Sequence, residues 1–237
     1  MDGKQEPNAQ NAAPMLSGAA PRRLVVGITG ASGAIYGIRL LEVLRDTPVE
    51  THLVLSEAAR RVIALETEHT PEQIEALADH SYEPTDIEAP ISSGSFLTMG
   101  MIVAPCSIKS LSAIAGCRGD TLLARAADVS LKERRKLVLV VRETPLHLGH
   151  LRLMTAVTEY GAVVLPPVPG FYHRPTTIGD LVDQTVGKML DQFGLDRRLF
   201  RRWPDGCGPC GPAGAPPAGV PPEAAPEERG ADDPPGG

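Results

Sequence analysis

Short apolar runs alternate with longer amphipathic segments along the middle of the chain. Continuous apolar runs, typical of strands buried on both faces, occupy residues 24–29, 52–55, 101–104, 137–141 and 162–165. Apolar residues with helical spacing occupy residues 35–44, 57–65, 71–79, 107–115, 121–134, 147–160 and 177–193. Strand followed by helix, repeated, predicts an α/β fold in three layers, with a parallel sheet covered by helices on both faces. We expect Pro105 to end the third of these strands.

The two ends of the chain differ from the middle in composition. Residues 1–21 are small, polar and interrupted by proline, and residues 204–237 hold 10 of the 23 prolines and 8 of the 24 glycines. Such segments cannot bury enough apolar surface to offset the entropy of the chain. We therefore expect one folded domain over residues 22–203, between a disordered N-terminal segment, 1–21, and a disordered acidic tail, 204–237.

Charge and cysteine content exclude several classes of protein. The formal net charge is −6, and the tail accounts for most of it, so no basic surplus is left to neutralise a nucleic-acid backbone. No apolar run approaches the roughly 20 residues that span a bilayer, and the first residues do not read as a signal peptide. Four cysteines in 237 residues do not make a disulfide framework. A soluble, reduced, cytoplasmic protein that binds neither nucleic acid nor membrane is expected.

Candidate ligand-binding residues follow the predicted strands, because ligands of open parallel sheets bind at the carboxyl ends of the strands. The first strand leads into Gly30, Ala31, Ser32 and Gly33. A hydroxyl between glycines at the start of a helix suits a phosphate group, and a tight turn without a ligand is the alternative. The spacing is not the G-x-G-x-x-G fingerprint, so a nicotinamide dinucleotide is not favoured.

Two further helix starts carry hydroxyl groups. Ser56 follows the second strand and can cap the next helix, contact a ligand, or both. Ser107, Ile108, Lys109 and Ser110 follow the third strand. A lysine in the first turn opposes the helix dipole, and this favours an anionic ligand nearby. Cys106, just before them, is expected to be a packed side chain.

Charged and aromatic residues form the remaining candidates. Arg142 and Glu143 follow the buried strand 137–141, where charges are costly unless they pair or serve a function. An ion pair between them and a catalytic carboxylate are the two interpretations. Arg125 and Lys132 are seven residues apart on one predicted helix and share a face, although a solvated helix end would also explain them. The proline-rich loop 166–175 either recognises a ligand or packs on its own aromatic residues.

Five segments together resemble the flavin prenyltransferases of the UbiX family, which have long been described as aromatic-acid decarboxylases. These segments are residues 27–37, 105–110, 125–135, 141–152 and 166–175. They occur in the family's order and cover nearly all of the predicted domain. The resemblance implies a flavodoxin-like, Rossmann-type sandwich, and homododecamers in which subunits share active sites.

The resemblance also implies an activity. Family members join a dimethylallyl group from dimethylallyl phosphate to N5 and C6 of reduced FMN. The product, prenylated FMN, is the cofactor of UbiD-type decarboxylases, which act in ubiquinone biosynthesis and in aromatic-acid breakdown. No metal is required for this reaction. No His/Cys cluster with metal-ligand spacing occurs within residues 22–203.

Matching positions imply roles for individual residues. The implied FMN-binding residues are Gly30, Ala31, Ser32, Ser56, Ser107, Ile108, Lys109, Ser110 and Arg142. The implied residues around dimethylallyl phosphate are Arg125, Lys132, Tyr172 and Lys188, with Ser32 and Glu143 managing protons and with Glu66, Ser93 and Trp203 at further pocket positions. Many relatives have arginine where this chain has Lys188. Lysine keeps the charge but loses the bidentate fork.

Two other functions compete with this interpretation. A flavin-dependent decarboxylase acting on a peptidyl or pantothenoyl cysteine would carry an asparagine in a P-A-S-A-N-T-like segment, and residues 104–110 contain none. A non-catalytic flavin-binding subunit would not need a second phosphate site such as Arg125 and Lys132. In the tail, Cys207 and Cys210 are spaced like a redox or zinc pair, but they supply only half of a tetrahedral site.

Overall fold

The computed structural model describes residues 22–203. The chain divides into two compact units, Met1–Arg201 and Arg202–Gly237. The predictions for residues 1–21 and 204–237, Cys207 and Cys210 included, lie outside the described residues. Within the described part, no helix is both long and apolar enough to cross a membrane. The fold given below is that of residues 22–201.

Six parallel strands form a single sheet. The strands are β1 (Arg23–Ile28), β2 (Glu50–Leu55), β3 (His80–Tyr82), β4 (Gly100–Cys106), β5 (Lys136–Val141) and β6 (Val163–Val164). Their order across the sheet is β3-β2-β1-β4-β5-β6, and every neighbouring pair is parallel. This is the Rossmann order, in which the chain runs outwards from β1 in one direction and then from β4 in the other. The carboxyl ends of β1 and β4 therefore flank the topological switch point.

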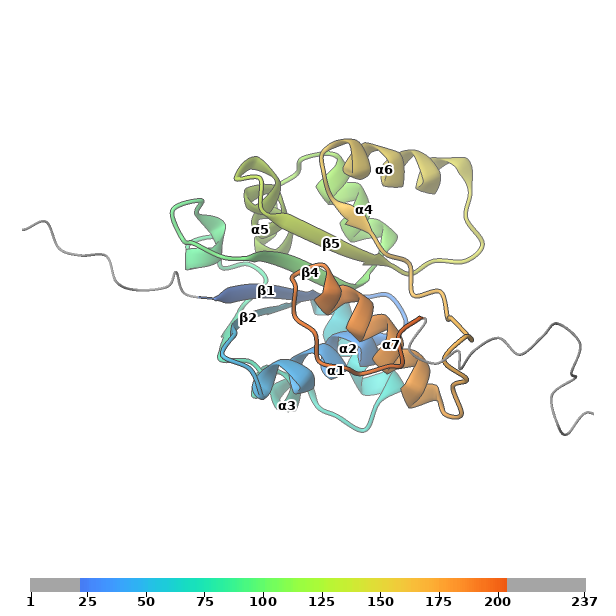
Figure 1. The fold of residues 1–237 in the computed structure, drawn as a ribbon. Coiled ribbons are helices and arrows are strands. Elements are labelled where there is room, and N and C mark those ends of the chain that lie inside the picture. Colours follow the sequence, from blue (N-terminus) through green and yellow to red (C-terminus); the bar gives the residue numbers. More distant parts are fainter. Residues whose placement is uncertain (1–21, 204–237) are drawn as a thin grey trace, which may run out of the picture. The chain divides into compact units, whose positions relative to one another are not determined.

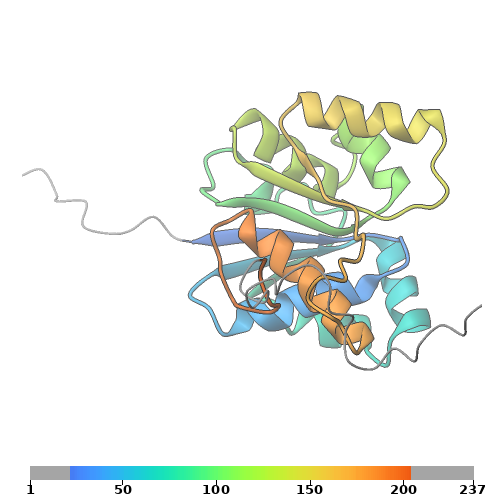
Figure 2. The same cartoon turned by 45° about the vertical axis from the view of Figure 1, so that its right-hand side comes forward.

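Helices cover both faces of the sheet and complete the three predicted layers (Figures 1 and 2). They are α1 (Ala34–Arg45), α2 (Glu57–Glu66), α3 (Pro71–Glu75), α4 (Ile108–Ala115), α5 (Leu122–Lys132), α6 (Leu148–Glu159) and α7 (Ile178–Asp191), with a short 3₁₀ helix at Pro90–Ser92. One core lies between the sheet and α1, α2, α3 and α7, and a second lies between the sheet and α4, α5 and α6.

The alternation of side chains along β1 explains why there are two cores. Leu24, Val26 and Ile28 belong to the first core and Val25 to the second, and all four are at most 2% exposed. Successive strand residues point to opposite faces, so a strand covered on both sides must be apolar at every position. The continuous apolar run in the sequence predicted this burial, and the prediction is confirmed.

Two details of the predicted elements are wrong. The helix expected over 71–79 ends at Glu75, and the short strand β3 follows it. β3 reads His-Ser-Tyr, three residues with no apolar run to reveal a strand. In addition, β4 does not stop at Pro105 but continues to Cys106. The pairing of β4 with β5 shifts register between Val103 and Cys106, so the ladder does not need the N–H that proline lacks.

Candidate functional site

Hydrogen bonds hold the carboxyl ends of three strands together. Thr29, buried directly after β1, donates from Oγ1 to the carbonyl oxygen of Pro105 over 2.8 Å and accepts from the N–H of Ser107 over 2.7 Å. The N–H of Arg142, after β5, donates to the carbonyl oxygen of Cys106 over 3.1 Å. These bonds place Ser107 and Arg142 at one edge of the sheet, beside the switch point. Thr29 was not among the predicted site residues, although a lone hydroxyl at the end of an apolar run was a usable signal.

At the turn from β1 to α1, where the sequence suggested a phosphate site or a turn without a ligand, the backbone donors bind a carboxylate of the chain itself. Gly33 caps α1 without a side-chain hydrogen bond and has a φ of 101°, which favours glycine. Its N–H donates to Oε2 of Glu66 over 2.7 Å. Glu66 is the last residue of α2 and also accepts from the Ser32 hydroxyl and the N–H of Ala34. The helix start therefore binds an oxyanion of carboxylate type.

Electrostatics keep Glu66 ionised. Burial acts to raise its pKa, but the hydrogen bonds from Ser32, Gly33 and Ala34, together with the charge of Arg142, hold the pKa below its ordinary value. Arg142 also acts on Tyr36 in α1, whose pKa is raised by burial and lowered in part by this guanidinium. Ser32, Glu66 and Arg142 thus share one electrostatic environment, although they come from three separate segments.

The packing of α2 requires a glycine at position 30 and is helped by a capping residue at position 56. A Cβ atom on Gly30 would lie 2.3 Å from the Cβ of Ala58, so the start of α2 can approach this turn only because residue 30 is glycine. Ser56 caps α2, accepting from the N–H of Ala59 over 3.1 Å, and its own N–H donates to Ile28. The predicted cap at Ser56 is confirmed. Contact of either residue, or of Ala31, with FMN stays a prediction.

The start of α4 carries two hydroxyl groups that bond to each other. Ser107 caps the helix, accepting from the N–H of Ser110 over 3.3 Å, and its hydroxyl donates to that of Ser110 over 3.2 Å. Lys109 is exposed and Ile108 half-buried. Cys106 is fully buried, and burial raises the pKa of its thiol to about 12. The prediction that Cys106 is a packed side chain rather than a nucleophile is confirmed.

Glu143 lies exposed at the same edge, directly after Arg142. Its Oε1 accepts from the N–H of Thr144 over 3.1 Å. Within residues 22–203 no ion pair joins it to Arg142. The ion-pair interpretation of these two neighbouring charges is therefore wrong. The carboxylate is available at the carboxyl edge of the sheet, where a proton acceptor would be needed.

A second group of predicted residues gathers around the segment that precedes β4. Arg125 donates to the carbonyl oxygen of Ser92 over 3.2 Å and to Asp128 over 2.8 Å. Lys132 pairs with Glu133. Ser93 shares a hydrogen bond of 2.8 Å with Ser95.

Within this second group, Lys132 lies far from Arg142 of the same chain. Lys132 lies four residues before the start of β5, and Arg142 directly follows its end. A strand of six residues is about 17–20 Å long, so the length of β5 separates the ammonium group from the guanidinium. One chain therefore does not bring Lys132 to the carboxyl edge.

A third group comes from the C-terminal part of the domain. Tyr172 lies between β6 and α7, 45% exposed, with its ring 5.5 Å from that of His173. The N–H of Gly170 donates to Gln184 over 2.9 Å and ties this segment to α7. Lys188 lies 3.5 Å from Asp191 and ten residues beyond the start of α7, about 15 Å along its axis. Trp203 falls in the second unit of the chain, so its role stays a prediction.

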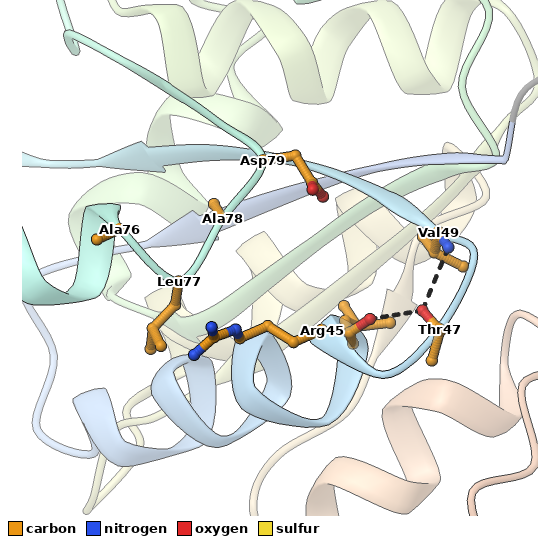
Figure 3. Close-up of a pocket in the computed structure, with 8 residues that line it drawn as sticks. Arg45, Thr47, Val49, Ala76, Leu77, Ala78 and Asp79 are labelled. Atoms are coloured by element: carbon orange, nitrogen blue, oxygen red, sulfur yellow. Dashed lines mark hydrogen bonds between the residues drawn. The ribbon is translucent and has the colours of Figure 1, made fainter.

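The pocket drawn in Figure 3 belongs to none of these groups. It lies between the end of α1 and the link from α3 to β3, and its lining includes Arg45 and Asp79. Asp79 is already engaged, accepting from the N–H and hydroxyl of Thr51 over 2.7 and 2.8 Å. The pocket is a full helix length, about 18 Å, from the turn that opens α1. None of the residues that line it is among the predicted site residues.

Comparison with known proteins identifies the family. A family model described as Flavoprotein matches residues 15–191. The flavin prenyltransferase UbiX of Escherichia coli strain K12 is 62% identical over 185 residues, which cover 77% of this chain and 98% of that protein. The chain belongs to the UbiX flavin prenyltransferase family. The predicted family and enzyme class are confirmed.

Two solved structures of UbiX-type proteins share the fold. One is AnUbiX (PadA1) in complex with FMN and dimethylallyl pyrophosphate, with a TM-score of 0.76 and 55% identity, covering 77% of this chain and 97% of that chain. The other is a dodecameric FMN-dependent UbiX-like decarboxylase from Escherichia coli O157:H7, with a TM-score of 0.75 and 52% identity, covering 76% and 98%. The predicted flavodoxin-like, Rossmann-type fold is confirmed.

Proposed function

We propose that this chain transfers a dimethylallyl group from dimethylallyl phosphate to N5 and C6 of reduced FMN. The observation that carries the proposal is that a 55% identical relative binds FMN and an allylic pyrophosphate together. The 62% identity to a flavin prenyltransferase along almost its full length supports the same reaction. A cysteine decarboxylase is disfavoured by the absence of asparagine from residues 104–110.

The residues at the carboxyl edge fit FMN. The start of α1 already binds a carboxylate through backbone N–H groups and the hydroxyl of Ser32, which shows that its donors suit an anion. Ser56 and Arg142 come from the same edge, and Ser107 to Ser110 supply further donors. We assign FMN binding to Gly30, Ala31, Ser32, Ser56, Ser107, Ile108, Lys109, Ser110 and Arg142. When bound, reduced FMN supplies the two nucleophilic positions, N5 and C6.

The remaining residues would stabilise the departing phosphate, exclude water and transfer protons. Cleavage of an allylic C–O bond leaves negative charge on the departing phosphate, and the cations Arg125, Lys132 and Lys188 stabilise it. Tyr172 contributes one wall of the pocket and helps to exclude water. Glu143, whose carboxylate is exposed beside Arg142, would accept the proton lost from C6 when C6 bonds to one carbon of the dimethylallyl C=C bond and the other carbon takes up a proton. Ser32 and Glu66, joined by a hydrogen bond, hold a second proton site next to the FMN donors.

We further propose that subunits complete one another's sites in a homododecamer. Within one chain Lys132 lies near the start of β5, a strand's length from Arg142 at the carboxyl edge, so we infer that a neighbouring copy supplies it to the site. Exposed apolar side chains near that edge and on α7 offer contact surface: Leu148 is 60%, Phe171 67% and Ile178 80% exposed. A homologue from Escherichia coli O157:H7 is dodecameric. Light scattering that shows a monomer with full activity would contradict this arrangement.

We also propose which protein receives the product and where in the cell both proteins act. Prenylated FMN would pass to a UbiD-type decarboxylase, and both proteins would work in the cytoplasm. Cell fractionation tests the location. Activation of a cofactor-free UbiD-type decarboxylase by the released product tests the recipient.

The mass spectrum of the flavin released after anaerobic turnover tests the function. Purified full-length chain is incubated with reduced FMN and either dimethylallyl phosphate or dimethylallyl pyrophosphate, without any partner protein. We expect the flavin to gain one dimethylallyl unit, C5H8, with release of inorganic phosphate from dimethylallyl phosphate or of pyrophosphate from dimethylallyl pyrophosphate. Unmodified flavin with both donors would overturn the proposal. Release of CO2 from a peptide ending in cysteine, with no change in flavin mass, would favour the decarboxylase instead.

A further inference from the structure

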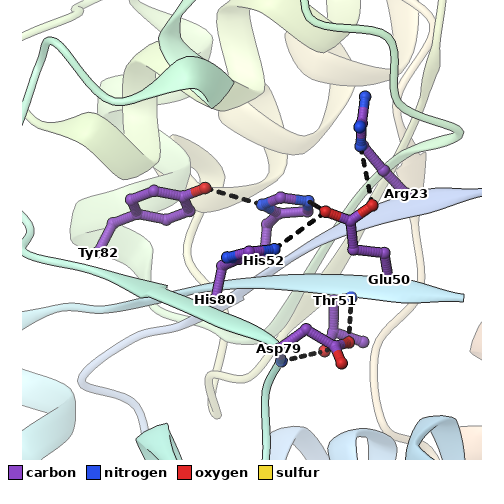
Figure 4. Close-up of polar contacts among 7 residues, drawn as sticks. All are labelled: Arg23, Glu50, Thr51, His52, Asp79, His80 and Tyr82. Atoms are coloured by element: carbon purple, nitrogen blue, oxygen red, sulfur yellow. Dashed lines mark hydrogen bonds and ion pairs between the residues drawn. The ribbon is translucent and has the colours of Figure 1, made fainter. Parts of the chain in front are cut away.

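Two histidines and a glutamate meet on one face of β2 and β3 (Figure 4). Glu50 and His52 are two residues apart on β2, so their side chains point to the same face of the sheet. His80 of β3 is the direct partner of His52 in the pairing of the two strands, and its side chain shares that face. None of the three is among the residues assigned to FMN or to the allylic phosphate. Glu50 is the first residue of β2, so this cluster lies at the opposite edge of the sheet from the FMN donors.

The spacing of the three groups matches a tetrahedral metal site. Oε1 of Glu50 lies 3.0 Å from Nε2 of His80 and 3.4 Å from Nε2 of His52. The three possible ligand atoms all lie within 4.8 Å of one another. Bonds of about 2.0–2.1 Å from a tetrahedral Zn²⁺ ion place neighbouring ligand atoms about 3.3 Å apart. The two imidazole rings are stacked, with centroids 4.8 Å apart and planes 16° apart, so the more exposed ring of His80 must turn for both nitrogens to face one ion.

His52 presents a nitrogen that the protein itself does not satisfy. The residue is 1% exposed, and its Nδ1 forms a hydrogen bond of 2.9 Å with the hydroxyl of Tyr82. Its Nε2 is buried without a hydrogen-bond partner, although it points towards Glu50. A buried polar atom left in this way costs free energy. Burial, reinforced by the neighbouring His80, lowers the pKa of His52 to about 4, so the ring is neutral near pH 7 and keeps a lone pair.

Surrounding side chains fix the orientation of His52 and Glu50. The ring of His52 packs edge-on against Phe96, with centroids 5.1 Å apart, while Tyr82 holds its other nitrogen. Nε of Arg23 donates to Oε2 of Glu50 over 3.0 Å, which leaves Oε1 directed at the imidazoles. Such outer partners orient the ligands of protein metal sites. The positive charge of Arg23 opposes a cation nearby, so we expect weaker binding than in a closed four-ligand site.

We propose that Glu50, His52 and His80 bind one divalent transition-metal ion, with Zn²⁺ the best fit to two imidazoles and a carboxylate. The side chains of His80 and Glu50 are 49% and 34% exposed, so solvent has access and water can complete the coordination. The ion would join the three-residue edge strand β3 to β2. The cluster escaped the sequence analysis because His52 and His80 lie 28 residues apart and meet only through strand pairing.

Calorimetric titration of chelator-treated full-length chain with ZnCl2 tests the proposal. His80→Asn is the main variant, because His80 is exposed and its loss leaves the Arg23–Glu50 ion pair intact. Two controls address other possible zinc ligands: His150→Asn disrupts the adjacent His147–His150 pair, and the double variant Cys207→Ser/Cys210→Ser removes the tail thiols. We expect one equivalent of Zn²⁺ to bind to the unsubstituted chain and to both controls. His80→Asn should weaken that binding by at least about 100-fold, more than the loss of an outer partner usually does.

A variant that affects only the orientation of His52, together with melting temperatures, distinguishes the loss of a metal ligand from a general destabilisation of the fold. Tyr82→Phe removes only the hydroxyl that orients His52, and should weaken Zn²⁺ binding about 10–100-fold. Zn²⁺ should raise the melting temperature of the unsubstituted chain but not that of His80→Asn. Unchanged affinity in His80→Asn, loss of the zinc equivalent in either control, or no binding to the unsubstituted chain would each overturn the proposal.

Discussion

At the scale of residues, the carboxyl edge shows how much chemistry the sequence could predict. A glycine, a hydroxyl and a helix start indicated an anion site, and the structure has a carboxylate bound at Gly33. The sequence could not reveal that Glu66, 33 residues away, supplies that carboxylate, because α2 must first fold against the β1–α1 turn. The family resemblance marked Glu66 only as a pocket position. Its hydrogen bonds to Ser32 and Gly33 now give it a physical role.

The lowered pKa of Glu66 predicts a pH dependence of stability. A carboxylate whose pKa is lower in the folded state stabilises the fold fully above its unfolded pKa, about 4.5, and loses that contribution as the pH falls through the folded value. Glu66→Gln should therefore melt below the unsubstituted chain at pH 7, and the two melting temperatures should converge as the pH falls below 4.5. Glu143→Gln, at an exposed carboxylate, is the control. A difference between Glu66→Gln and the unsubstituted chain that stays constant with pH would contradict this role.

At the scale of elements, periodicity predicted the long helices and the buried strands but not the exceptions. Ser56, Ser107 and Thr177 cap the starts of α2, α4 and α7, and the predicted helices begin within one residue of these three helices. The strand β3 carries no apolar pattern and exists because its backbone pairs with β2. β4 runs through Pro105 because its partner shifts register there. Both exceptions depend on pairing with a neighbouring strand, and the order of apolar and polar residues within one segment does not reveal that pairing.

Thr29 joins two of these elements, and its removal should be costly. Thr29→Val keeps the shape of the side chain but deletes the hydroxyl that bonds Pro105 and Ser107. Because the N–H of Ser107 loses its acceptor while the Pro105 carbonyl keeps only the N–H of Thr29, we expect a loss of about 1–3 kcal/mol in the free energy of unfolding. Urea denaturation measures it. Thr29→Ser, which keeps the hydroxyl, should lose clearly less, and an equal loss in both variants would argue against the hydrogen bonds as the cause.

At the scale of the whole molecule, the fold was predictable and the complete site was not. Alternating strands and helices predicted a parallel three-layer sandwich, and the observed strand order places a ligand site at the switch point between β1 and β4. The family resemblance, rather than their shared helix face, implied that Arg125 and Lys132 act together. Only the structure shows that β5 separates Lys132 from Arg142. This separation is the basis of the proposal that neighbouring subunits complete each site.

The central claim is that this chain is a flavin prenyltransferase whose sites are completed by neighbouring subunits. Lys132→Ala removes a cation for the allylic phosphate. Glu143→Gln removes the proton acceptor, and loss of general acid–base catalysis typically lowers a rate by about 10²–10⁴-fold. Each variant alone should bind FMN and form prenylated FMN far more slowly.

The most direct measurement is the rate of prenylated FMN formation, followed by the mass of the released flavin, in oligomers co-assembled from these two variants. If Lys132 and Glu143 of one site come from different chains, some sites in the mixed oligomer contain neither substitution. The account predicts that co-assembly restores a substantial fraction of the unsubstituted rate. A mixed oligomer no faster than its two parents would contradict it, because each site would then draw both residues from a single chain.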